Sequence, residues 1–266
     1  MNDREALSRD ELRRYSRPLL LPEWAGAQAQ ERLQAASVLV VGAGGLGCPA
    51  LSYLAGAGVG RIGISDGDTV SLSNLHRQTL YSTPDLGRPK ASVAAARLQR
   101  LNPYVRPEVL PALQAETSPE LVRRYDLVLD CTDNFTTRHA INAACVAAAV
   151  PLVSGAAIRF DGQISVFDSR SNASPCYACL FPPTGQAEDI NCATMGVFAP
   201  VVGIIGAMQA AEALKLITGT GSSLAGRLLL FDGRESEWTS IGVARDPGCT
   251  VCGTAARGRW HRPKGC

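Results

Sequence analysis

The stretch VLVVGAGGLGCPA, residues 38–50, decides the fold of this chain. It opens with an apolar run, residues 38–41, that is typical of a buried parallel strand. Glycines follow at once in the pattern G-x-G-x-x-G, in which the backbone turns tightly from a strand into the N-terminus of a helix. These glycines are Gly42, Gly44, Gly45 and Gly47. The stretch therefore predicts a strand, a glycine-rich loop and a helix.

Two helices are expected before this stretch, and strands and helices are expected to alternate after it. The capping-box pattern at residues 8–11 predicts the start of a short helix. Further helices are predicted over 23–35, 87–101 and 135–149, and further strands over 61–65, 126–130 and 152–154. This order indicates an α/β fold with a Rossmann-like, doubly wound and mostly parallel sheet.

The pattern changes in the second half of the chain. Two antiparallel hairpins are predicted over 158–168 and 228–243, with Asp161-Gly162 and Asp232-Gly233 as turn signals, and an apolar helix near 197–217 lies between them. We expect a single domain with four parts. These are N-terminal helices (1–36), a nucleotide-binding core (37–157), antiparallel strands with the buried helix (158–253), and a basic tail (254–266) that is expected to be disordered.

Composition narrows the class of protein. The chain has 266 residues, 46% of them hydrophobic and 19% charged, and a net charge of +2, which gives no general bias toward nucleic acid. The charged N-terminus lacks the apolar run of a secretory signal. The uncharged stretch 192–211 is interrupted by glycine, proline and glutamine, so a buried helix is expected rather than a membrane span. We expect a cytoplasmic protein with no membrane or nucleic-acid partner.

The glycine-rich loop indicates a nucleotide site. Glycines allow close approach of a phosphate, and the helix N-terminus offers free N–H groups and a partial positive charge. Asp66 ends the next predicted strand, 24 residues after Gly42, where its carboxylate could accept bonds from a ribose. A glycine turn needed only for helix–strand packing is the alternative. This motif alone leaves the choice between NAD and ATP open.

Phosphate-directed side chains follow the second predicted strand. If residues 73–78 form one helical turn, Asn74, Arg77 and Gln78 share a face. Arginine offers a fork of donors suited to phosphate oxygens. Lys90, in the first turn of a predicted helix, opposes the helix dipole, which favours an anion at that site over a solvated lysine. A nicotinamide enzyme has no need of so many donors, so the set favours a triphosphate.

Two aspartates follow the strand DLVLD. Asp130 and Asp133 lie where ligands bind in open α/β sheets, at the carboxyl ends of the strands. Magnesium bound to a triphosphate needs a nearby carboxylate, and Asp133 is the candidate. An N-cap for the next helix is the alternative role for Asp133.

Four of the nine cysteines form two C-x-x-C pairs, and they are Cys176, Cys179, Cys249 and Cys252. A tetrahedral Zn²⁺ site needs four such thiolates, and a closed set of four is structural. The predicted ion would tie separate hairpins together. A redox-active pair or two disulfides is the alternative, which the absence of a secretory signal disfavours.

These features resemble the MoeB/ThiF family, bacterial relatives of ubiquitin-activating enzymes. The resemblance covers nearly the whole chain. It rests on RYSR at 14–17 and the blocks VLVVGAGGLGCPA, ISDGDTVSLSNLHRQTLY, GRPK, LVLDCTDN, PLVSGAAIRFDGQISVFD, PCYACL, MGVFAPVVGIIGAMQAAEALKL and DPGCTVC.

The resemblance implies a homodimer that binds ATP and Mg²⁺. By position, Arg17 would reach the triphosphate in the partner protomer's site, and Asp133 would hold Mg²⁺. Asp66 would bind the ribose, Asn74, Arg77, Gln78 and Lys90 would clamp phosphates, and Asn134 is placed among the nucleotide-binding residues. The implied reaction adenylates the C-terminal Gly-Gly carboxylate of a ubiquitin-like, MoaD- or ThiS-like sulfur carrier, in molybdopterin or thiamine biosynthesis.

The resemblance also concerns the sulfur chemistry. In this family a cysteine at the position of Cys192 can form a covalent link to the activated carrier, and a free thiol without a catalytic role is the alternative. No rhodanese segment follows the second cysteine pair, so we expect a separate sulfurtransferase or cysteine desulfurase as the sulfur donor. Two other functions compete with this one: an NAD-dependent oxidoreductase on the same core, and a non-catalytic scaffold. The scaffold would be expected to lose Arg77, Lys90 or Asp133, and all three are present.

Overall fold

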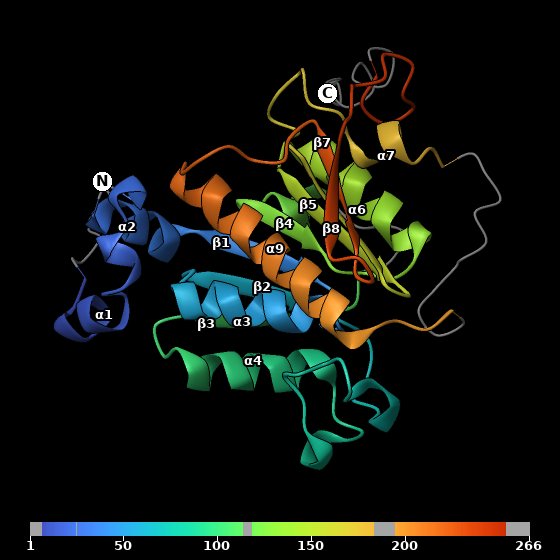
Figure 1. Cartoon of the computed structure of the whole chain (residues 1–266). Coiled ribbons are helices and arrows are strands. Elements are labelled where there is room, and N and C mark those ends of the chain that lie inside the picture. Colours follow the sequence, from blue (N-terminus) through green and yellow to red (C-terminus); the bar gives the residue numbers. More distant parts are fainter. Residues whose placement is uncertain (1–6, 25, 114–118, 184–194, 254–266) are drawn as a thin grey trace, which may run out of the picture.

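The computed structural model describes residues 7–24, 26–113, 119–183 and 195–253 (Figure 1). Cys192 and the basic tail lie outside the described residues. The strands are β1 Ser37–Val41, β2 Arg61–Ser65, β3 Arg106–Leu110, β4 Leu127–Asp130, β5 Leu152–Ile158, β6 Asp161–Phe167, β7 Arg227–Asp232 and β8 Glu237–Gly242. The α-helices are α1 Arg9–Arg14, α2 Ala27–Ala35, α3 Gly47–Ala57, α4 Lys90–Leu101, α5 Pro119–Val122, α6 Phe135–Ala148, α7 Tyr177–Leu180 and α9 Ala199–Thr218. Short 3-10 turns are η1 Pro18–Leu20, η2 Pro22–Trp24, η3 Leu72–Asn74 and η4 Thr83–Asp85.

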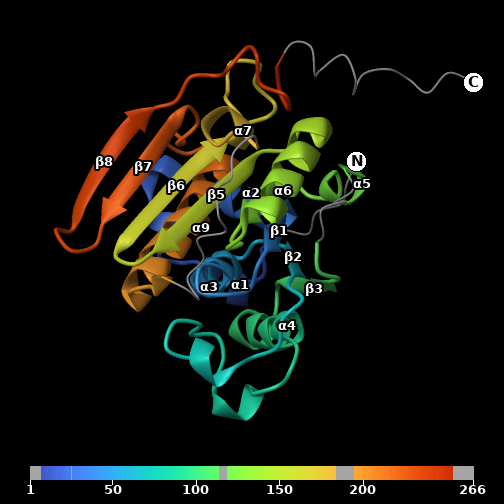
Figure 2. The same cartoon turned by 90° about the vertical axis from the view of Figure 1, so that its right-hand side faces the viewer.

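The described strands form one eight-stranded sheet in the order β3-β2-β1-β4-β5-β6-β7-β8. The strands from β3 to β5 pair in parallel, and those from β5 to β8 pair antiparallel. Figure 2 shows the antiparallel strands side by side at one end of the sheet. The predicted α/β class, with a mostly parallel sheet and antiparallel strands toward the C-terminus, is confirmed.

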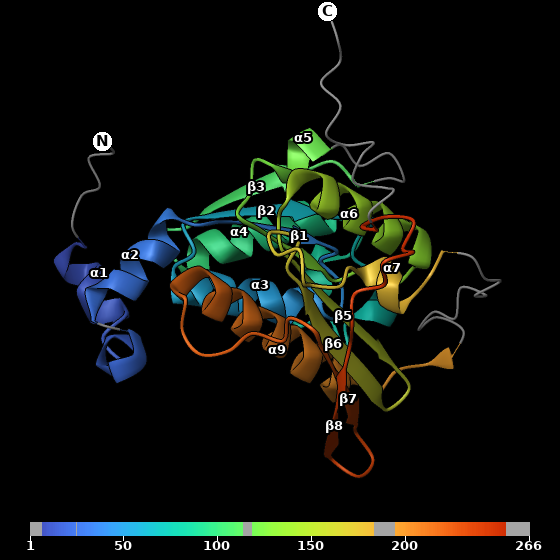
Figure 3. The same ribbon diagram turned by 90° about the horizontal axis from the view of Figure 1, so that it is seen from above.

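Alternating side chains of the central strands build a core on each face of the sheet. In β1, Val38 and Val40 belong to the cluster under α3, α4 and α9, whereas Leu39 and Val41 belong to the cluster under α6. Figure 3 shows α3 and α9 on one side of the strands and α5 and α6 on the other. Burial of both faces explains why β1 is apolar throughout.

Several element boundaries differ from the sequence prediction. The helix predicted from residue 87 begins at Lys90, because Pro89 is its N-cap and holds extended ψ. The helix predicted over 23–35 is a 3-10 turn, η2, followed by α2. Strand β3 was not predicted; it contains Pro107 and is partly exposed, as an edge strand allows. The capping box on Ser8 is present as predicted.

The first predicted hairpin turns two residues earlier than its sequence signal. Ile158 pairs with Asp161, so Arg159 and Phe160 form the turn and Asp161-Gly162 begins β6. Gly162 is required there for a different reason, since a Cβ would lie 2.6 Å from the side chain of Ile205 in α9. In the second hairpin, Asp232 ends β7 and residues 233–236 form the turn, close to the prediction.

Helix α9 is a core helix, as the sequence predicted. By length and composition alone it could cross a membrane, and it is the one such helix among the described residues. In the structure it packs on α3 and β5, and its side chains Val201, Ile205, Ala210 and Ala213 join the core. Its buried amide, Gln209, donates to the carbonyl of Asp130 at 2.7 Å. The helix thereby anchors the end of β4.

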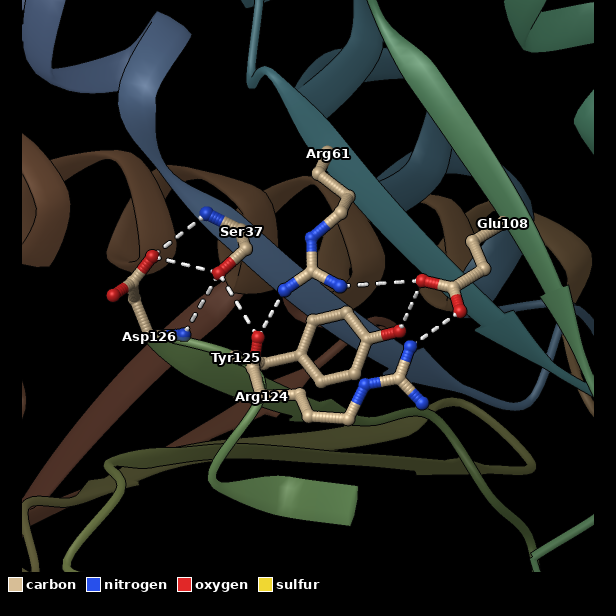
Figure 4. Close-up of polar contacts among 6 residues, drawn as sticks. All are labelled: Ser37, Arg61, Glu108, Arg124, Tyr125 and Asp126. Atoms are coloured by element: carbon tan, nitrogen blue, oxygen red, sulfur yellow. Dashed lines mark hydrogen bonds and ion pairs between the residues drawn. The ribbon is translucent and has the colours of Figure 1, made fainter. Parts of the chain in front are cut away.

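The amino ends of the parallel strands are joined by a polar network (Figure 4). Glu108 in β3 accepts hydrogen bonds from Tyr125 at 3.0 Å and Arg124 at 2.7 Å, and it pairs with Arg61 at 3.2 Å. Asp126 accepts from the backbone N–H of Ser37 at 2.8 Å. This network fixes the strand register at the amino ends of the strands, whereas the glycine-rich loop lies at their carboxyl ends.

Candidate active site

A cavity of about 960 Å³ opens at the carboxyl ends of the parallel strands. Ten of the predicted nucleotide-binding residues line it: Gly42, Gly44, Gly45, Asp66, Asn74, Arg77, Gln78, Lys90, Asp133 and Asn134. Gly47 and Arg17 do not line it. The cavity therefore brings together groups from five separate segments of the sequence.

Glycine is required at different positions of the loop for different physical reasons. Gly42 has φ of +92°, and a Cβ there would lie 2.6 Å from the carbonyl oxygen of Cys131. At Gly47, the first residue of α3, a Cβ would lie 2.0 Å from the carbonyl oxygen of Gly42. Tight packing thus explains these two. Gly44 instead borders the cavity, where a Cβ would meet only the Gln78 amide at 3.5 Å. The lack of a side chain at Gly44 therefore keeps the cavity open.

Backbone donors at the start of α3 face no side-chain cap. The N-cap, Leu46, makes no side-chain hydrogen bond. The N–H of Cys48 already donates to the carbonyl of Gly44 at 2.9 Å and residue 49 is a proline, so α3 itself contributes mainly its dipole. The N–H groups that remain for an anion at the cavity belong to Gly44, Gly45 and Leu46 of the loop. The loop is therefore a cradle that fits a phosphate.

The expected helical turn at 73–78 is present. The backbone N–H groups of Arg77 and Gln78 donate to the carbonyl of Asn74 at 3.1 and 3.0 Å. The guanidinium of Arg77 donates to the side chain of Asn74 at 3.0 Å, so the two groups share a face. Gln78 is buried, and its Oε1 has no hydrogen-bond partner among the described residues. An unpaired amide oxygen in the wall of a cavity fits a site that is completed by a ligand with a hydrogen-bond donor.

Lys90 is buried with a side chain 4% exposed, which excludes the solvated lysine considered from the sequence. Its ammonium lies 2.8 Å from the carboxylate of Asp68, and its backbone N–H donates to the Asp68 carbonyl at 2.9 Å. A buried ammonium needs such a counter-charge. Asp68 is 74% exposed and lines the same cavity. Asp68 was not predicted as a site residue, although it stands two residues after Asp66 at the same strand end.

Asp66 both faces the cavity and braces the loop. Its Oδ2 accepts the N–H of Ala43 at 2.7 Å, and its Oδ1 accepts the N–H of Asp68 at 2.8 Å. Burial raises the pKa of Asp66 above its usual value, while these backbone bonds act in the opposite direction.

The two aspartates after β4 differ in environment. Asp130 is fully buried, accepts hydrogen bonds from Thr132 and from Ser154 at 2.9 Å, and lies 3.7 Å from Arg138. Asp133 is exposed and lines the cavity. The N-cap of α6 is Asn134, whose side chain accepts the N–H of Thr137 at 2.8 Å, so the N-cap alternative for Asp133 is wrong. Asp133 therefore keeps its carboxylate at the cavity surface.

Arg138 is a site residue that the sequence analysis missed. It is 6% exposed, lines the cavity from α6 and donates to the carbonyl of Thr132. Burial opposes its charged form, but Asp130, Tyr177 and Asp133 together outweigh burial and raise the pKa of Arg138. The one signal available was an arginine a helical turn after the N-cap in an otherwise alanine-rich helix.

Arg17 lies far from the cavity of its own chain. It is exposed and follows Tyr15, which packs against Gly58 at the C-terminal end of α3. The glycine-rich loop lies at the other end of α3, whose 11 residues span roughly 16 Å. Arg17 therefore has no place in the cavity that its own chain forms.

The four predicted zinc ligands come together. Their sulfur atoms lie within 4.8 Å of one another, with Cys176–Cys249 at 3.7 Å, Cys179–Cys252 at 3.4 Å and Cys176–Cys179 at 3.9 Å. Zn–S bonds of about 2.3 Å in a tetrahedron place sulfurs about 3.8 Å apart. The cluster fits Zn²⁺, and the cysteines are not disulfide-bonded.

The elements that carry this cluster differ from the prediction. Cys176 and Cys179 lie at the start and within the short helix α7, and Cys249 and Cys252 lie in the turn after β8. The cluster thus joins a helical turn to a loop, not two hairpins. Backbone N–H groups of Asp246 and Val251 approach the sulfurs of Cys179 and Cys249 at 3.5 Å. Such N–H···S contacts favour thiolate ligands.

The cluster is connected to the cavity through Tyr177. This residue follows Cys176, is 2% exposed and lines the cavity. Its ring packs on Phe167, with ring centroids 5.9 Å apart, and on Phe181 at 4.9 Å, and burial raises its pKa to about 12. An ion at the cysteine cluster would therefore stabilise one wall of the cavity.

Comparisons with known proteins agree with this arrangement. The ThiF family model matches residues 15–251. The chain is 50% identical over 251 residues to the sulfur carrier protein adenylyltransferase of Thermus thermophilus, covering 92% of each chain. It is 47% identical over 254 residues to the sulfur carrier protein ThiS adenylyltransferase of Escherichia coli, covering 95% of this chain and 97% of that one.

A solved structure shares the fold. The crystal structure of E. coli MccB with MccA-N7isoASN matches with a TM-score of 0.78 and 25% sequence identity, over 91% of this chain and 75% of that one. A family model over most of the sequence, and relatives about half identical along nearly all of it, establish that this chain belongs to the ThiF family.

Proposed function

We propose that this protein uses ATP to adenylate the C-terminal glycine carboxylate of a ubiquitin-like sulfur carrier. The observation that carries the proposal is the single cavity that unites the glycine-rich loop with Arg77, Lys90 and Asp133. Relatives matched over nearly their whole length are named adenylyltransferases of sulfur carriers. The NAD-dependent alternative leaves Arg77 and Lys90 without a role and is not favoured.

In the proposed reaction an oxygen of the carrier's carboxylate attacks the α-phosphorus of ATP. A bond forms between that oxygen and the α-phosphorus, the bond from the α-phosphorus to the bridging oxygen breaks, and pyrophosphate leaves with its electron pair. The attacking carboxylate is already ionised, so no general base is needed. The protein's contribution is alignment and charge stabilisation.

The cavity supplies that stabilisation from three directions. The glycine-rich loop offers backbone donors to phosphate oxygens, and the N-terminus of α3 adds its dipole. Arg77 and Asn74, already bonded to each other, approach from the 72–78 turn, and Gln78 lines the wall beside Gly44. The ammonium of Lys90 is buried beside them, where a low dielectric strengthens its attraction to phosphate. We assign Asp66 to the ribose.

Asp133 is assigned to Mg²⁺, with Asn134 beside it in the cavity wall. Asp133 is exposed at the cavity surface, whereas Asp130 is buried and engaged by Ser154, Thr132 and Arg138. Bound Mg²⁺ offsets negative charge on the phosphate oxygens. Asp133 offers it a hard oxygen ligand, as Mg²⁺ prefers.

We propose a homodimer in which Arg17 completes the partner protomer's cavity. The support is geometric: Arg17 lies at the end of α3 opposite to its own glycine-rich loop, on an exposed segment. The four-cysteine cluster is proposed to hold structural Zn²⁺. A covalent role for Cys192, a separate sulfur donor and a cytoplasmic location remain predictions.

ATP–pyrophosphate exchange against purified sulfur carriers of several pathways tests the proposed function. Each carrier is supplied with its terminal glycine and, as the matched control, without it. We expect exchange with one intact carrier or more and none with the shortened forms. Exchange that does not depend on any carrier, or binding of NAD without binding of ATP, would contradict the proposal.

A further inference from the structure

A buried tyrosine outside the cavity connects the segments that form it. Tyr81 follows the 72–78 turn and is 6% exposed. Its hydroxyl donates to the carbonyl of Ala43 at 2.7 Å and lies 3.4 Å from the carbonyl of Lys90. Because a hydroxyl has one proton, the shorter contact is the hydrogen bond. Tyr81 thus holds the glycine-rich loop next to the first turn of α4.

The same residue is tied to the turn that carries Arg77. The backbone N–H of Tyr81 donates to the carbonyl of Gln78 at 3.1 Å. The glycine-rich loop, the Arg77–Gln78 turn and the start of α4 come from separate parts of the sequence, and each supplies proposed phosphate contacts. Tyr81 is in contact with all three.

Both peptide groups that flank the Cα of Ala43 are held by hydrogen bonds. Its N–H donates to Asp66 at 2.7 Å, and its carbonyl accepts from Tyr81 and, at 3.5 Å, from the thiol of Cys48. The thiol is a weak donor, so Tyr81 is the stronger of the two. Gly42, the preceding residue, has φ of +92°, and a glycine can also adopt negative φ values at little cost. The bond from Tyr81 therefore restrains a loop that is intrinsically adaptable.

We propose that Tyr81 is a positioning residue that holds the glycine-rich loop in its nucleotide-binding conformation. This inference rests on the proposed use of ATP at this cavity. Without the hydroxyl the loop samples other conformations, and ATP must restore the competent one, so the cost appears in ATP affinity. The ring remains and keeps its place in the core.

The test is Tyr81→Phe, which removes the hydroxyl alone. We expect the Kd for ATP from calorimetry and the KM for ATP in pyrophosphate exchange to rise about tenfold, as loss of one hydrogen bond to a buried carbonyl implies. The KM for the carrier should stay unchanged. A role in stability alone would lower the melting temperature and leave both ATP constants at the wild-type values, which would overturn the inference.

Tyr125→Phe is the matched control. Tyr125 is 3% exposed, and its hydroxyl donates to Glu108 at 3.0 Å (Figure 4). This contact lies toward the amino ends of the parallel strands, away from the cavity. This variant should lose stability without a change in ATP affinity. An equal rise in Kd for ATP in both variants would show a general effect of destabilisation and refute the role of Tyr81.

Cys48→Ala provides a second variant if Tyr81→Phe does not fold. It removes the weaker donor to the Ala43 carbonyl, so a smaller rise in Kd for ATP, about twofold to threefold, is expected. An unchanged Kd would then overturn the inference. If wild-type protein fails to bind ATP, both the proposed function and this inference fail. If the wild type binds ATP and Tyr81→Phe binds it equally well, the inference fails alone.

Discussion

The carboxylate of Asp130 lies 3.7 Å from the buried guanidinium of Arg138, and it has no access to the cavity surface that Asp133 occupies. Two aspartates three residues apart therefore have different tasks. Asp130 holds the strand end through Ser154, Thr132 and Arg138, and Asp133 faces the cavity.

Neutralising each aspartate should separate these tasks. Asp130→Asn leaves the buried charge of Arg138 without its partner, so the free energy of unfolding should fall by about 3–5 kcal/mol. Asp133→Asn should leave stability near the wild-type value and lower carrier-dependent pyrophosphate exchange by about 10²–10³-fold. Denaturant unfolding and exchange assays measure the two effects. Equal loss of stability in both variants would contradict the assignment.

Arg77→Ala should lower the rate of carrier-dependent pyrophosphate exchange by about 10²–10³-fold, because one preorganised cationic contact to phosphate is lost. Arg88→Ala is the matched control. Arg88 is also an arginine of the β2–α4 connection, but it pairs with Asp85 at 3.0 Å and does not line the cavity. We expect near-wild-type exchange from the control. A wild-type rate in Arg77→Ala would refute the phosphate role.

The cysteine cluster should bind about one Zn²⁺ per chain, with a contribution on the order of 10 kcal/mol to folding. Cys179→Ser should lose the metal and lower the melting temperature. Cys145→Ala, at a buried cysteine of α6 outside the cluster, should keep it. Metal analysis of both proteins decides the matter, and retention of full zinc content by Cys179→Ser would be inconsistent with the proposed site.

Subunit mixing tests the role of Arg17. Arg17→Ala and Asp133→Asn proteins should each retain only a small fraction of the wild-type activity alone. A one-to-one mixture that exchanges subunits should recover about a quarter of the wild-type activity, because half of the dimers are mixed and each mixed dimer has one intact site. No recovery, despite subunit exchange shown by labelling, would place Arg17 outside the partner's site.

Acid should remove the contribution of Asp85 to stability. A hydrogen bond from the Ser82 hydroxyl, together with one from Arg97, lowers the pKa of Asp85 from 3.8 to about 2. Burial acts in the opposite direction but is outweighed. A group with a lowered folded pKa contributes stability above its unfolded pKa and loses it as pH falls toward the folded pKa. The stability difference between wild type and Asp85→Asn should therefore be constant at neutral pH and shrink between pH 3.8 and about 2. Unfolding in urea at stepped pH measures it.

The sequence predicted those parts that depend on local patterns. The strand, glycine-rich loop and helix at 38–50 follow from apolar run and glycine spacing, and the cysteine cluster follows from two C-x-x-C pairs. The tertiary partners did not follow. Neither the pairing of Lys90 with Asp68 nor that of Arg138 with Asp130 has a sequence signal, because each joins residues from different elements.

Turn positions show the same limit. Asp161-Gly162 has the composition of a hairpin turn, yet Gly162 is needed in β6 because α9 packs closely over it. The actual turn uses Arg159 with φ of 51°, which an arginine seldom adopts. Packing by a distant helix decided the register, and the local sequence could not.

Strand β5 bonds to β4 on one side in parallel and to β6 on the other antiparallel. Because β5 pairs with a strand of each half, the two halves of the chain form one continuous sheet and cannot be separated without breaking strand pairing. A break of the chain in the turn at 159–160 would leave β5 and β6 in separate pieces, and each piece alone would expose an unpaired strand edge that favours aggregation. Inserted residues are better accommodated in the turn at 233–236, beyond the last paired residues of β7 and β8. Insertions are therefore expected in surface loops and not between the two halves of the sheet.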